Sequence, residues 1–114
     1  MKRNLMIGIS VQITKYISDD PQPGIIECCL LDAYGNEWVF RDKTPIFSSL
    51  DLNADSDYPK PGVIDCEIVK QWQDVNGREI VSVSTEKPWS VETLDGVSRF
   101  DVLKSQIIEI NQNP

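Results

Sequence analysis

The sequence predicts an all-β fold: a small antiparallel, partly open β-barrel of the SH3-like kind, or a sandwich, with six to seven strands. Apolar residues alternate with polar ones at a period of two, turn residues separate these segments, and helical periodicity is nearly absent. Strands joined by short turns pair antiparallel, and a sheet in 114 residues must curl or fold over to bury one face. We therefore expect a single β domain over residues 1–114.

The first three expected strands lie within residues 5–43. Residues 5–14 have the alternation of a strand with one buried face, formed by Leu5, Ile7, Ile9, Val11 and Ile13. Two prolines and a glycine end this strand within residues 18–24. Residues 25–33 are apolar on both sides, which is typical of a central strand, and residues 34–36 turn the chain into residues 37–43. A two-residue turn there predicts one shared face, formed by Cys29, Leu31, Ala33, Trp38 and Phe40.

The longest irregular stretch is residues 44–62, which contain three prolines and an acidic centre. A loop of this length in a small domain is often functional, and a short helical turn over residues 48–52 fits its sequence. Alternation resumes at Val63. The apolar side of this strand carries Ile64, Cys66, Ile68 and Trp72, with Lys70 as an exception whose charged end would reach solvent at a rim.

Two Gly-containing turns define the last expected hairpins. Asn76-Gly77 is typical of a two-residue type I′ turn and would set Trp72 opposite Val81. Asp95-Gly96 predicts a second such hairpin, with the pairs Val91–Phe100, Trp89–Val102 and Glu92–Arg99. Residues 104–110 fit an edge strand or a short helix equally well.

The charge and composition argue against several classes of function. The chain has 18 acidic and 11 basic residues, a net charge of −7, so we expect no nucleic-acid partner. Histidine is absent, which removes the commonest general base and zinc ligand. The glycines stand singly at turns, with no phosphate-binding motif. We therefore expect a non-enzymatic protein with no catalytic residues, cofactor or metal.

The cysteines and the apolar segments bear on the compartment. Cys28, Cys29 and Cys66 all fall within expected strands, where small, inert core thiols are typical. An odd number of cysteines with an adjacent pair favours reduced thiols in a cytoplasm over a disulfide framework. No apolar run approaches the ~18 residues of a membrane span, so we expect no membrane partner.

An acidic segment is the most distinctive functional feature. Residues 51–67 hold five acids and one lysine, a net charge of −4. Such a patch favours association with a basic protein, and the candidate partner-binding residues are Asp51, Asp55, Asp57, Tyr58, Asp65 and Glu67. A concrete version is an immunity-like protein that neutralises a basic toxin. Oxygen donors at alternate positions from Asp51 also resemble the start of an EF-hand loop, but the required glycine and glutamate are missing, which leaves weak calcium binding as an alternative.

A second alternative is a β-barrel that binds a small ligand. Aromatic residues at strand ends or in loops would form the rim of such a site, and the candidates are Tyr34, Phe47 and Tyr58.

Several short strings resemble a family of short bacterial proteins. They are Asp32-Ala33-Tyr34-Gly35, Phe40 to Pro45, Tyr58 to Cys66, Lys87 to Glu92 and Asp95-Gly96. The resemblance extends over roughly residues 25–105 and implies a bacterial, single-domain protein. It implies no activity, substrate or cofactor. In the family a histidine often stands at the position of Trp38, a departure that weakens any role assigned to that residue.

Overall fold

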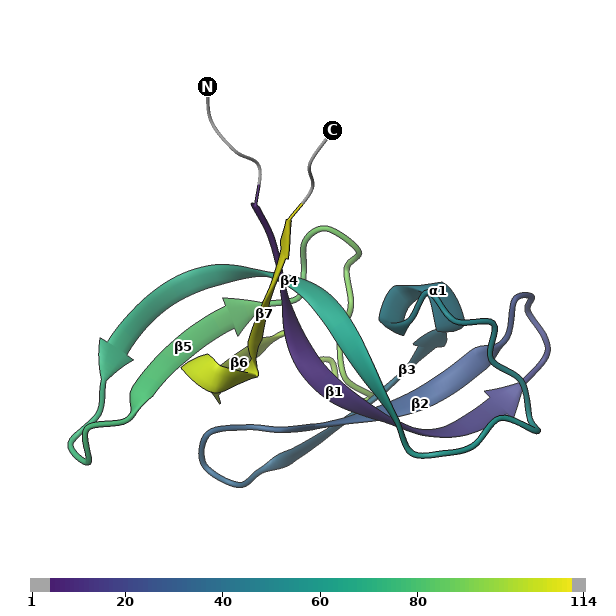
Figure 1. Cartoon of the computed structure of the whole chain (residues 1–114), viewed down its shortest axis with the longest axis horizontal. Coiled ribbons are helices and arrows are strands. Elements are labelled where there is room, and N and C mark those ends of the chain that lie inside the picture. Colours follow the sequence, from purple (N-terminus) through teal and green to yellow (C-terminus); the bar gives the residue numbers. More distant parts are fainter. Residues whose placement is uncertain (1–4, 112–114) are drawn as a thin grey trace.

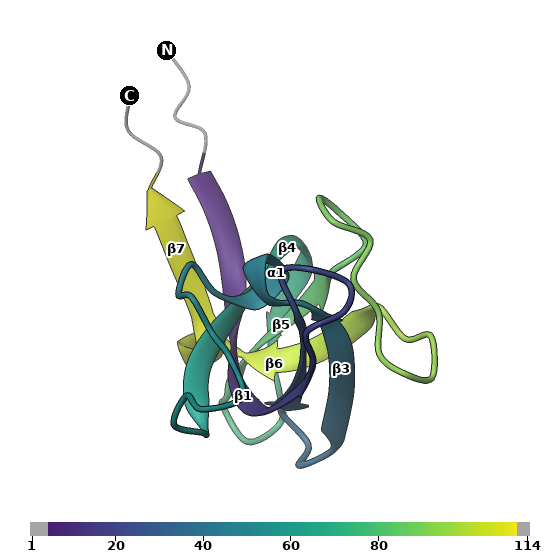
Figure 2. The same cartoon turned by 90° about the vertical axis from the view of Figure 1, so that its right-hand side faces the viewer.

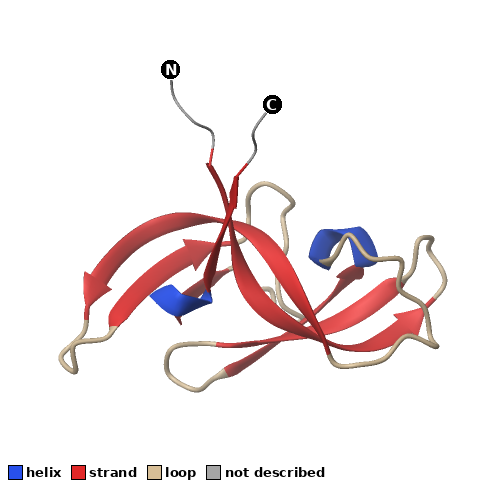
Figure 3. Cartoon of the chain, in the orientation of Figure 1, coloured by secondary structure: helices blue, strands red, loops and turns tan. Residues whose placement is uncertain are grey.

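The computed structural model of the chain describes residues 5–111, and it is built almost entirely of antiparallel strands (Figures 1 and 3). The all-β prediction is thus confirmed, with seven strands. They are β1 (Leu5–Ser18), β2 (Ile25–Leu31), β3 (Glu37–Lys43), β4 (Lys60–Gln73), β5 (Glu79–Ser84), β6 (Arg99–Leu103) and β7 (Ile107–Asn111). Two short helices complete the fold: α1 (Thr44–Phe47) and the 3-10 turn η1 (Lys104–Gln106).

The sheet is a half-barrel organised around the long strand β1 (Figure 1). The strand order is β3-β2-β1-β4-β5-β6. β4 pairs with one edge of β1, and the other edge pairs first with β7 and then with β2. The curled sheet brings its two ends together, since Ala33 N donates to Asp101 O at 2.9 Å and Leu94 N donates to Val39 O at 3.0 Å. These bonds partly close the barrel.

The concave side of the sheet holds one hydrophobic core. Alternate residues of the strands point into it, as predicted for β1, where Ile9, Val11 and Ile13 are buried. Phe40 packs edge-to-face against Phe47 and Phe100, with ring centroids 6.5 and 5.6 Å apart. Each fully buried side chain of this size contributes roughly 1.5–3 kcal/mol to folding.

Three five-residue loops share one geometry, which differs from the predicted two-residue turns. They span residues 32–36, 74–78 and 93–97, and in each the first and fifth residues are joined by a backbone hydrogen bond of 2.9 Å. The glycine at the fourth position has a φ of +81° or +84°, as in a type I turn followed by a bulge. A side-chain oxygen of the first residue accepts the N–H of the fifth and stabilises the longer loop; these first residues are Asp32, Asp74 and Thr93.

The longer loops move the strand registers by one residue. Leu30 lies opposite Trp38 and Cys28 opposite Phe40, so the predicted shared face of Cys29, Leu31 and Ala33 with Trp38 and Phe40 is wrong. The pairing of Trp72 with Val81 is wrong for the same reason, since Trp72 lies opposite Ile80. The pairs predicted around Asp95-Gly96 are also wrong: β6 pairs with β5, and Phe100 lies opposite Val83.

A bulge in β4 explains the position of Lys70. The register with β5 shifts between Ile68 and Lys70. Ile68 faces the core opposite Val83, whereas Lys70 lies opposite Ser82 on the convex side, as does Trp72 opposite Ile80. Trp72 therefore does not share the face of Ile64, and the Lys70 ammonium lies 5.0 Å from the Trp72 ring centroid.

Two further predictions concern the helical turn at residues 48–52 and the element at residues 104–110. The helical turn lies at α1, residues 44–47, rather than at residues 48–52, which are irregular. Residues 104–110 contain both expected elements, because η1 leads directly into β7.

Gly8 is required by close packing between β1 and β4. A Cβ atom at this position would overlap Val63 Cγ1 and lie 3.2 Å from Ile64 O. We expect Gly8→Ala to lower the free energy of unfolding by about 1–3 kcal/mol, measured by urea denaturation. Ser10→Ala, at the next convex position of β1, should have little effect. Val63→Ala in the Gly8→Ala background should restore part of the loss, and simple additivity of the two changes would contradict the overlap.

Candidate functional site

An apolar groove lies on the convex side of the sheet beside α1. Its volume is about 640 Å³. Residues of β1, β4 and β7 form its floor, and α1 and the residues after it form its wall. Figure 2 shows α1 on the side of the molecule that faces the viewer. The apolar lining includes Pro45, Ile46, Leu50, Val63 and Ile108. Val63 and Ile108 occupy positions where a solvent-facing strand residue is usually polar, a pattern that the sequence analysis did not use to locate this site.

Two buried side chains hold the wall in place. Phe47 is 2 % exposed and Leu52 is 6 % exposed, and both belong to the core. Leu50 lies between these anchors and is 57 % exposed at the groove, while its N–H donates to Ser48 Oγ at 3.0 Å. The wall approaches β4 closely at Gly62, where a Cβ atom would lie 2.9 Å from Ile13 Cγ1 and 3.1 Å from Phe47 O.

Trp89 lies on the surface beside this groove, not in a strand opposite Val102 as predicted. It is 54 % exposed, and its Nε1 donates to Asp65 Oδ2 at 2.9 Å. Asp65 is half-buried and lines the groove. The loop that carries Trp89 is fixed from inside, since the buried Thr85 hydroxyl donates to Val91 O at 2.6 Å.

The predicted acidic residues fall into two groups. Asp65 lines the groove, Asp51 follows Leu50 at its wall, and Glu67 is exposed on the same face of β4 as Asp65. Asp55 and Asp57 are exposed further along the loop. Within the described part of the chain, none of these five carboxylates forms an ion pair. Tyr58 is half-buried, and its hydroxyl donates to Asn53 O at 2.7 Å, so it stabilises the loop itself.

The three proposed ligand-binding aromatics do not form one rim. Phe47 is a core residue that is 2 % exposed, and it borders the groove beside α1 rather than a rim shared with Tyr34. Tyr58 belongs to the loop before β4, whereas Tyr34 lies in the β2–β3 loop at the end of the half-barrel. Tyr34 borders a separate polar depression of about 350 Å³, together with Trp38, Ser82, Arg99 and Asp101.

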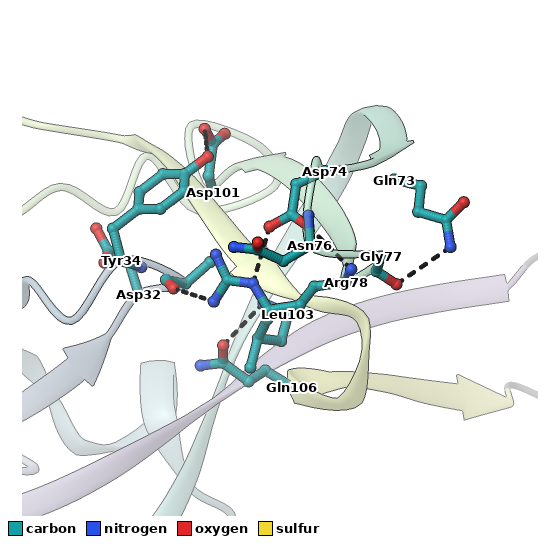
Figure 4. A network of polar contacts seen from close by, with 11 residues as sticks. Asp32, Tyr34, Gln73, Asp74, Asn76, Gly77, Arg78, Asp101, Leu103 and Gln106 are labelled. Carbon is teal, nitrogen blue, oxygen red and sulfur yellow. Dashed lines mark hydrogen bonds and ion pairs between the residues drawn. The ribbon is translucent and has the colours of Figure 1, made fainter.

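A polar network ties the β2–β3 loop to the opposite side of the half-barrel (Figure 4). The Tyr34 hydroxyl donates to Asp101 Oδ2 at 3.0 Å, and Arg78 Nη1 donates to Ala33 O at 2.9 Å. Arg78 is itself paired with Asp74 at 2.8 Å. The network thus closes the end of the fold where the sheet is open.

Asp32 is the buried acid of this region. Its carboxylate accepts hydrogen bonds from Tyr34 N, from Asn36 N and Nδ2, and from Trp38 Nε1, at 2.9 to 3.2 Å. Burial would raise the pKa of Asp32, but these hydrogen bonds outweigh burial and hold its pKa below the usual value. The Asp32 carboxylate therefore has a structural role, since its oxygens accept hydrogen bonds from residues of the same loop and of β3.

The cysteines and the metal alternatives have no supporting geometry. All three thiols are free, and burial raises the pKa of Cys66 to about 12 and raises those of Cys28 and Cys29. Such thiols are poor nucleophiles at neutral pH. Among the residues that the structure describes, no three Cys, Asp or Glu side chains are grouped to hold a metal ion. The calcium alternative at residues 51–57 therefore has no support from the side-chain arrangement.

The groove beside α1, with its apolar lining, the exposed Leu50 and Trp89 and the nearby carboxylates, is the candidate site. Neither helix within residues 5–111 has the length or apolar character needed to span a bilayer. A scan against protein-family models, a search of the curated proteins and a search of the solved structures each found no match.

Proposed function

We propose that the protein is a non-enzymatic interaction module that binds a basic protein partner in the groove beside α1. The observation that carries this proposal is the combination of an apolar groove with exposed Leu50 and Trp89 and a concentration of negative charge around it. Interfaces are typically built from apolar and aromatic anchors surrounded by a polar rim. Leu50 and Trp89 would be the anchors, and the carboxylates would form the rim.

The distribution of charge supports a basic partner. Residues 51–67 have a net charge of −4, with five acids and one lysine, and residues 85–98, which carry Trp89, have a net charge of −2, with three acids and one lysine. These two segments together account for −6 of the chain's net charge of −7. A field concentrated in this way raises the association rate with a basic partner and disfavours nucleic acid.

A specific form of this proposal is neutralisation of a basic toxin in the bacterial cytoplasm. A bound immunity-like protein would cover the toxin's positive surface through the acidic rim of the groove. The three free cysteines, of which Cys28 and Cys66 are buried, are compatible with that compartment.

Charge reversal tests the proposal. The partner is sought by co-expression with the products of neighbouring genes, and affinity is then measured by calorimetry. We expect Asp51→Lys combined with Glu67→Lys to weaken binding about tenfold or more near 0.05 M salt, with a smaller difference near 0.5 M salt because screening is stronger.

The matched control is Asp20→Lys combined with Glu37→Lys, which changes the net charge equally at exposed positions outside the groove. It should change affinity much less than the groove pair. Equal losses in both double variants would contradict the assignment of the groove, and the lack of any basic partner that binds would contradict the proposed function.

The polar depression beside Tyr34 supports small-ligand binding as a second candidate. Its lining carries hydrogen-bonding side chains from two adjacent strands, among them Ser82 of β5 and Arg99 and Asp101 of β6. A ligand hydroxyl or amine would pair with such groups. A thermal-shift screen with small polar compounds, repeated on Ser82→Ala, would distinguish this candidate from the first.

A further inference from the structure

We infer that Trp89 and Asp65 together receive an arginine side chain of the segment that binds in the groove. This inference rests on the proposed function and names the chemistry by which the groove selects its partner. It is based on the hydrogen bond between these two residues, their exposure, the position of Asp65 in the groove lining and the charge of the segments that carry them.

The hydrogen bond orients both groups for a cation. Trp89 Nε1 donates to Asp65 Oδ2 at 2.9 Å, which fixes the indole while the residue stays 54 % exposed. Asp65 Oδ1 accepts no hydrogen bond from any residue within the described part of the chain. A cation above the ring could therefore interact with the indole face and with the free carboxylate oxygen at the same time.

The surroundings favour a positive side chain at this position. Glu67 lies two residues along β4 on the same face as Asp65, and Glu86 is exposed in the loop that carries Trp89. The basic residues of these two segments are Lys60 and Lys87, and neither forms an ion pair with Asp65. Asp65 is half-buried and has no cationic side chain of these segments paired with it. A cation supplied by the bound protein would therefore interact with it strongly.

Arginine fits this pair better than lysine does. Its planar guanidinium stacks on an aromatic face and keeps in-plane N–H donors for a carboxylate, whereas an ammonium ion is a strongly hydrated point charge. The apolar lining at Leu50 and Val63 would take apolar side chains next to the arginine. The preferred segment is therefore an arginine flanked by aliphatic residues.

Synthetic peptides test this selection. Four acetylated nine-residue peptides of leucine and serine carry arginine, lysine, citrulline or glutamate at the centre. Binding to the full chain is followed by NMR of the tryptophan indole N–H signals, with Trp89 assigned from Trp89→Phe. We expect the arginine peptide to bind roughly fivefold to tenfold more tightly than its citrulline isostere, to exceed the lysine peptide, and to shift the Trp89 signal selectively.

Three variants separate this inference from the proposed function. Asp65→Asn should reduce the preference for arginine over citrulline, because only the indole face of Trp89 then remains to interact with the cation. Leu50→Ser should weaken all four peptides alike, and Trp72→Phe should change neither the preference nor the affinities. Unaltered melting temperatures would show that the variants remain folded. Equal affinities of wild type for arginine and citrulline, or a preference that is undiminished in Asp65→Asn, would overturn the arginine site while leaving the groove in place. Failure of every peptide to bind would contradict the groove, and with it the arginine site.

Discussion

Replacing Phe47 with alanine is expected to lower the free energy of unfolding by about 3–5 kcal/mol, the range for removing a buried aromatic side chain. Phe47 is 2 % exposed and packs edge-to-face on Phe40, with ring centroids 6.5 Å apart. It is the last residue of α1, so its loss also releases the wall of the groove. Because small domains have only about 5–15 kcal/mol of stability, urea denaturation should show a much lower midpoint.

Leu50→Ala is the matched control for this prediction. Leu50 lies three residues further along the same wall but is 57 % exposed, so its truncation should change the free energy of unfolding by less than about 0.5 kcal/mol. The two variants should therefore separate stability from binding: Phe47→Ala loses both, and Leu50→Ala loses affinity for the partner alone. A stability loss below about 1 kcal/mol in Phe47→Ala would show that the wall is not anchored in the core.

The strands could be predicted from the sequence because their burial follows directly from alternation. Ile9, Val11 and Ile13 are buried as their period-two pattern indicates. The strand registers could not be predicted, because they depend on whether the side chain of a turn residue accepts a hydrogen bond from a backbone N–H. The carboxylate of Asp74 does so at 2.9 Å from Arg78 N, and this favours a five-residue loop over the two-residue turn that Asn76-Gly77 alone indicates.

The candidate site was predicted only in part, for related reasons. Three residues of the acidic segment, Asp51, Asp65 and Glu67, lie at or near the groove, so this part of the candidate site follows from the sequence. Phe47 was expected to be a rim residue because it lies in an irregular, proline-containing segment, but α1 folds back onto the core. Trp89 was expected to lie opposite Val102 in a hairpin, and only the fold places it beside Asp65.

Asp32→Asn is expected to lower the free energy of unfolding by about 1–3 kcal/mol at neutral pH, because it leaves buried donors unpaired. The remaining oxygen could still accept the N–H groups of Tyr34 and Asn36, which both bond to Asp32 Oδ1. The new amide nitrogen, however, would face Trp38 Nε1, which donates to Oδ2 at 2.9 Å in the native protein. Two donors would then point at each other in a region where Asp32 is only 8 % exposed.

Asp74→Asn is the matched control, because Asp74 has the same place in the same type of loop. Its Oδ1 accepts Asn76 N and Arg78 N, but its Oδ2 is paired with the exposed Arg78 side chain. Loss of that surface ion pair should cost less than about 1 kcal/mol. If the two variants lost equal stability, the indole hydrogen bond of Trp38 would not be the source of the difference.

The dependence on pH provides an independent check of Asp32. Because its pKa is lowered in the folded protein, its contribution is fully present above the unfolded-state pKa of about 3.9 and is lost as the pH falls through the folded-state value. The difference in stability between wild type and Asp32→Asn, measured by urea denaturation from pH 7 downward, should therefore stay constant to about pH 5 and shrink below it. A difference that stayed constant at the acid end, where Asp32 is protonated in both states, would show that the carboxylate charge does not stabilise the loop.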